Sequence, residues 1–144
     1  MPKSLSLGNG NMLVCTDKYA QVRDLYFPYV GLENHLGGHY AHRVGVFADH
    51  QLNWFGHPNW KIDIALAKDS LVGETVAKND ALGVILNISD TVYNEKNIFL
   101  RTFTIKNNTD RERTIKLYFN HEFEIYESHR GDTAYFDPLH HAII

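Results

Sequence analysis

The sequence predicts an all-β protein, an antiparallel sandwich of two sheets, and three observations support this fold class. Short runs of β-branched and aromatic residues recur along the chain, and turn-forming residues end each run. Aromatic residues make up 12% of the 144 residues, which favours sheet, and helical periodicity is hard to find. The roughly nine or ten expected strands exceed what one flat sheet carries before it splits into two packed layers.

The first part of the chain is expected to form three hairpins, each with an Asp or Asn in its connection, because these residues suit tight reversals. The hairpins pair residues 12–16 with 21–27, 43–48 with 51–55, and 71–77 with 83–88, across Asp17-Lys18, Asp49-His50 and Asn79-Asp80. Residues 62–66 are expected to form an isolated strand. The Gly8-Asn9-Gly10 segment is expected to be a turn before the first strand.

The clearest hairpin signal comes from residues 98–106 and 114–126, which flank the polar connection 107–112. In the second segment, apolar side chains alternate with polar ones, and we expect its apolar face to be half-buried. The residues of that face are Ile115, Leu117, Phe119, Phe123 and Ile125.

Composition excludes several classes of function. The formal net charge is −3 and the basic residues are scattered, so the sequence predicts no nucleic-acid partner. No apolar run reaches the roughly 18 residues of a membrane helix, and the first residues lack a signal peptide, so we expect no membrane and a cytoplasmic location. Cys15 is the single cysteine and is expected in the core. No phosphate loop or dinucleotide motif is present, and we expect no cofactor.

No repeat, linker or charge block divides the chain, so residues 1–144 are expected to form one domain. The chain ends on the apolar run Ala142-Ile143-Ile144, as a strand cut partway would. We therefore expect a fragment of a longer chain. An unpaired sheet edge beside this run would also promote self-association of the isolated domain.

Three histidines, His35, His39 and His42, form the densest group of metal-ligating side chains. Gly37-Gly38 lies among them and indicates a loop, which could gather three imidazoles. Only Glu33 is near in sequence to support such ligands, so we favour polar loop histidines that contact a neighbouring surface and expect no metal.

Candidate catalytic residues are sparse. His121 falls on the apolar face of its strand and could be a buried base, but a histidine bonded to backbone near a strand end is the favoured interpretation. Glycoside hydrolysis uses paired carboxylates. Glu122, Glu124 and Glu127 alternate as a solvated face does, and we expect no catalytic residue.

Two tryptophans give the best local indication of sugar contact. Trp54 and Trp60 flank a Pro-containing loop, and flat aromatic rings stack on the apolar faces of pyranose rings. Core packing is the favoured alternative for Trp54, which lies at a strand end.

Five segments, taken together, resemble the N-terminal domain of prokaryotic family 15 glycoside hydrolases, and they keep that order over nearly the whole chain. They are residues 6–14 (SLGNGNMLV), 22–28 (VRDLYFP), 43–47 (RVGVF) with Trp54-Phe55, 102–107 (TFTIKN) and 132–138 (DTAYFDP).

The resemblance implies a many-stranded supersandwich of the galactose-mutarotase type, joined to an (α/α)6 barrel that hydrolyses α-glucosidic bonds with inversion. The family's catalytic glutamates belong to that barrel, and no acid here matches them. The loop from Tyr26 and Pro28 through His35 and His39 to His42 is expected to face the partner domain or the rim of its active site.

Three functions follow. The first is a non-catalytic, folding-assisting domain of a glucoamylase-like hydrolase. The second is a stand-alone carbohydrate-binding module that binds α-glucan through Trp54 and Trp60. The third is a metal-dependent β-sandwich enzyme that uses His35, His39 and His42.

Overall fold

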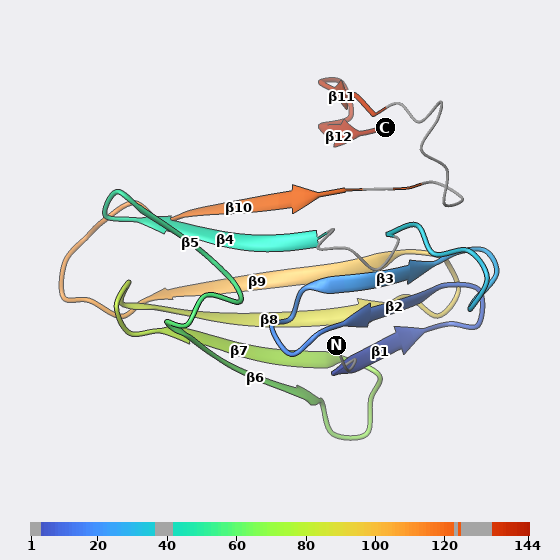
Figure 1. Cartoon of the computed structure of the whole chain (residues 1–144), viewed down its shortest axis with the longest axis horizontal. Coiled ribbons are helices and arrows are strands. Elements are labelled where there is room, and N and C mark those ends of the chain that lie inside the picture. Colours follow the sequence, from blue (N-terminus) through green and yellow to red (C-terminus); the bar gives the residue numbers. More distant parts are fainter. Residues whose placement is uncertain (1–3, 37–41, 123, 125–133) are drawn as a thin grey trace.

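The computed structural model describes residues 4–36, 42–122, 124 and 134–144. Its strands form two antiparallel sheets packed face to face, with a short third pair beside them (Figure 1). No α-helix occurs among the described residues, and hence none that could cross a membrane. The predicted all-β, two-sheet sandwich is therefore confirmed.

The larger sheet has six strands in the order β1-β2-β3-β4-β10, with β5 also paired to β4. Its strands are β1 (Leu5–Gly8), β2 (Leu13–Thr16), β3 (Val22–Tyr26), β4 (His42–Ala48), β5 (Gln51–Trp54) and β10 (Lys116–His121). The smaller sheet runs in chain order through β6 (Trp60–Leu66), β7 (Gly73–Asn79), β8 (Val84–Val92) and β9 (Phe99–Asn107). The third pair is β11 (Phe136–Asp137) with β12 (Ala142–Ile143).

The three hairpins expected from turn residues all form, as β2–β3, β4–β5 and β7–β8. The tightest connects β4 and β5 through Asp49 and His50, whose φ angles are 51° and 63°. Two consecutive positive φ values match the type I′ turn, whose twist suits two-residue hairpins. A local signal therefore set this pairing correctly.

The fourth expected hairpin, 98–106 with 114–126, is wrong, because its strands lie in different sheets. Strand β9 pairs with β8, whereas β10 pairs with β4. Arg113 holds the crossover: its guanidinium donates to Asp49 at 2.6 Å and to the carbonyl oxygens of Leu82 and Gly83 at 2.6 and 2.7 Å. The polar connection therefore bridges the two sheets.

Two smaller expectations also need correction. The segment 62–66 is not isolated, since β6 pairs with β7 along its whole length. Gly8-Asn9-Gly10 does not precede the first strand but follows it, because β1 pairs with β2 on either side of this turn. The strand at residues 5–8 is short and has only two buried side chains, too few to show a clear alternation.

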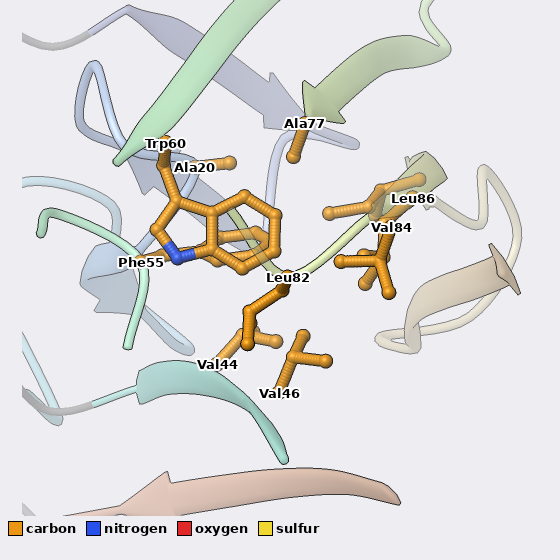
Figure 2. Packing of buried hydrophobic residues seen from close by; sticks show 10 residues of the cluster. Ala20, Val44, Val46, Phe55, Trp60, Ala77, Leu82, Val84 and Leu86 are labelled. Atoms are coloured by element: carbon orange, nitrogen blue, oxygen red, sulfur yellow. The ribbon is translucent and has the colours of Figure 1, made fainter. Parts of the chain in front are cut away.

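The core lies between the sheets and is best shown by β8, where buried and more exposed residues alternate along nine positions. One cluster of buried side chains surrounds Phe55, Trp60 and Leu86, with Val44 and Val46 contributed by the opposite sheet (Figure 2). A second lies under β1 to β3 and includes Leu7 and Val14. Cys15 is buried, as expected.

Candidate functional site

In the part of the chain that the structure describes, the sandwich is open along one side, where the terminal strands of the two sheets, β9 and β10, leave a cavity between them. Its volume is about 500 Å³, within the range of roughly 300–1,000 Å³ usual for binding sites. We call it the open-edge cavity. It is lined by Val22, His42, Arg43, Val44, Phe99, Arg101, Phe103, Phe119, His121 and Ile143.

Aromatic side chains from both sheets meet in this cavity. The rings of Phe103 on β9 and Phe119 on β10 make an edge contact, with centroids 5.3 Å apart. Phe119 nevertheless remains 46% exposed. A phenylalanine that faces the opposite sheet but stays half in water indicates an incompletely covered interface.

A histidine pair forms the polar part of the cavity. His42 and His121 are opposite each other in the register of β4 and β10, and their rings meet edge to face at 4.4 Å. Burial, with smaller effects of the neighbouring His121 and Arg101, lowers the pKa of His42 from 6.5 to about 3. Burial, followed by the charge of Arg101, also lowers the pKa of His121. Both imidazoles are therefore neutral at pH 7.

These lowered pKa values predict acid sensitivity. Below pH 6.5 the unfolded chain takes up a proton at His42 and the folded chain does not, so stability falls as the pH drops from 6.5 towards 3. We expect the free energy of unfolding, measured by urea titration, to be lower at pH 5 than at pH 7. This decrease should be about 1–2 kcal/mol larger in the wild type than in His42→Gln. Equal pH dependence in both proteins would contradict the assignment.

Arg101 forms the charged floor of the cavity. Its Nε and one Nη donate to the two carboxylate oxygens of Asp90 at 2.7 and 2.8 Å, and the guanidinium also donates to the Ala20 carbonyl at 2.8 Å. The Asp90 side chain is 1% exposed and that of Arg101 is 11% exposed. This buried pair joins β8 and β9 to the loop after β2.

The described part of the loop expected to face a partner domain, residues 26–36, carries hydrogen bonds within itself. Tyr26 ends β3 and bridges to Asn34, and the Phe27–Pro28 peptide is cis. His35 donates from its ring to the Phe27 carbonyl oxygen. The loop thereby presents Tyr29 and Leu32 as exposed apolar side chains.

The three loop histidines are not seen as a cluster. His35 bonds within its loop, His42 packs against His121 in the open-edge cavity, and His39 lies outside the described residues. Within the described ranges, no group of three or more His, Cys, Asp or Glu side chains could hold a metal ion.

The two tryptophans differ sharply. Trp60 is 8% exposed and packs against Phe55 with ring centroids 4.7 Å apart, so it offers no free ring face to a sugar. Figure 2 shows its indole between Ala20, Leu82 and Phe55. Trp54 is half-buried on the outer face of the larger sheet, opposite Gly45.

The carboxylates described here do not resemble an acid–base pair. A hydrogen bond from Arg113 lowers the pKa of Asp49, and one from Lys78 lowers that of Asp80. A general acid needs the opposite shift. Glu122 is exposed at the end of β10 and accepts a hydrogen bond from Asn120.

The sequence did not indicate the importance of Arg101 or the pairing of His42 with His121. Arg101 sits at an inward position of β9, between Phe99 and Phe103, and a cation on an apolar face is the signal that could have marked it. The histidine pairing joins residues 79 positions apart in the chain (121 − 42), for which the sequence carries no local signal.

Comparison with known proteins gives one relative. No protein-family model matches the chain, and no solved structure does. The chain is 27% identical over 130 residues to an uncharacterized glycosyl hydrolase of Methanocaldococcus jannaschii. The match covers 90% of this chain but only 20% of the length of that relative. This similarity relates the chain to glycosyl hydrolases.

Proposed function

We propose that this chain is a non-catalytic β-sandwich domain of a glucoamylase-like glycoside hydrolase that acts on α-glucosidic bonds. The similarity to one-fifth of a glycosyl hydrolase carries the proposal, because four-fifths of that relative lie outside the match, and we place the catalytic machinery in that remainder. The resemblance of segments such as residues 22–28 to family 15 implies that the substrate has α-glucosidic bonds. It also implies an (α/α)6 catalytic domain in the same longer polypeptide.

The residues at the surface are consistent with a non-catalytic domain that packs against another part of the protein. Aromatic residues and neutral histidines line the open-edge cavity, and none of the described residues that line it is a carboxylate. Half-exposed apolar side chains such as Phe119, and the exposed Tyr29 and Leu32 after β3, suit contact with another protein surface. The remaining polypeptide is the partner that we propose for both surfaces.

Hydrogen exchange tests this packing. We expect backbone amides at the free edges of β9 and β10 to exchange at least about tenfold more slowly in the longer polypeptide than in residues 1–144 alone, because a packed edge must open before it exchanges. Amides of β6, at the opposite edge of the smaller sheet, provide the matched control and should exchange alike in both. Equal exchange at β9 and β10 would overturn the proposed packing.

A further inference from the structure

The outer face of the larger sheet carries an aromatic group that the proposed function does not use. The strand register places its side chains together: Gly45 is opposite both Trp54 and Tyr118, and Phe47 is opposite Lys116. Val44 and Val46 point into the core, so their neighbours on β4 point outward. We call Phe47, Trp54 and Tyr118 the aromatic face.

Gly45 fixes the orientation of the Trp54 ring. A Cβ at Gly45 would lie 2.8 Å from Cε3 of Trp54 and 3.0–3.1 Å from the two atoms bonded to it. Nearly equal distances to three consecutive ring atoms mean that this Cβ would sit above the ring and not at its edge. The indole therefore lies flat on the backbone of β4, and no other residue type fits at position 45 without moving it.

Hydrogen-bond donors border the flat surface. The Arg43 guanidinium lies over the Trp54 ring, 4.9 Å from its centroid, and a cation–π contact of this kind is weak where solvent reaches it. Asn120 is opposite Arg43 in the register and Lys116 is exposed. Tyr118 is 43% exposed, and its ring meets Phe47 at 6.4 Å.

A pyranose ring needs this combination of groups. Its apolar C–H face stacks on flat aromatic rings, while its hydroxyls accept hydrogen bonds from guanidinium, ammonium and amide groups. Arg43 can leave the Trp54 ring at small cost and donate to a hydroxyl. Tyr118 is already open to solvent on the same surface.

We propose that the aromatic face is an α-glucan-binding surface, on which Tyr118 and Trp54 stack against glucose units and Arg43 and Asn120 donate to their hydroxyls. The choice of an α-linked glucan rests on the proposed function, whereas the aromatic and donor groups themselves require only a pyranose sugar. Binding here would hold substrate near the catalytic domain without taking part in hydrolysis.

Titration with maltoheptaose, followed by NMR of the tryptophan indoles in residues 1–144, tests this inference. The chain has two tryptophans, so two indole signals are expected. We expect the Trp54 signal to shift saturably and the buried Trp60 signal to stay in place. Tyr118→Ser should weaken binding at least about tenfold, because it removes the exposed ring on which a glucose unit stacks. Tyr93→Ser, which removes an exposed tyrosine from another part of the fold, should not.

Four outcomes would overturn the inference. The first is an unmoved Trp54 signal at saturating sugar, and the second is binding that Tyr118→Ser leaves intact. The third is equal binding of cellohexaose, which would remove the preference for α-linkages. If the aromatic face is instead protected from exchange in the longer polypeptide, it is a protein interface. None of these outcomes bears on the proposed function, which is tested separately by glycoside hydrolysis with the longer polypeptide.

Discussion

Arg101→Met is expected to lower the free energy of unfolding by about 3–5 kcal/mol, the usual cost of breaking a buried ion pair by removing one partner. The substitution leaves the Asp90 carboxylate, 1% exposed, without its bidentate partner, and it leaves the Ala20 carbonyl without the donor at 2.8 Å. Native domains are stable by roughly 5–15 kcal/mol. A change of this size therefore removes a large part of the total, and urea denaturation measures it.

Two controls separate the buried pair from a general effect of lost charge. Lys61→Met removes an exposed ion pair with Asp80 and should cost far less stability than Arg101→Met, because solvent screens exposed pairs. The double variant Asp90→Val/Arg101→Met leaves no unpaired charge and should recover most of the lost stability. If Arg101→Met costs no more than Lys61→Met, the buried pair does not have the structural role assigned to it.

Local signals predicted most of the strands. The Asn79-Asp80 turn between β7 and β8 and the Asp49-His50 turn between β4 and β5 each depend on residues adjacent in the chain, and both hairpins form in the structure. The predicted hairpin of residues 98–106 with 114–126 was wrong, because contacts with distant residues outweighed the local turn composition. The polar connection after β9 has the composition of a hairpin turn. Arg113 in this connection donates to carbonyl oxygens about 30 positions earlier, and the chain then enters the other sheet as β10.

The site was less predictable than the fold for the same reason. The sequence grouped His42 with His35 and His39 by proximity along the chain, whereas the sheet register places it against His121. Trp54 and Trp60 look equivalent in sequence, yet one lies flat on Gly45 outside the sheet and the other fills the core. Strand pairing across the chain decides both outcomes.

Hydrolysis of maltoheptaose, measured as glucose released, tests the central claim most directly. We expect the longer polypeptide that we propose to release glucose, and residues 1–144 alone to release none above a blank, because no described carboxylate lines the open-edge cavity. The expected result is therefore measurable glucose release by the longer polypeptide and none by residues 1–144. Glucose release by residues 1–144 that Glu122→Gln abolishes would contradict the claim and place the chemistry in the sandwich itself.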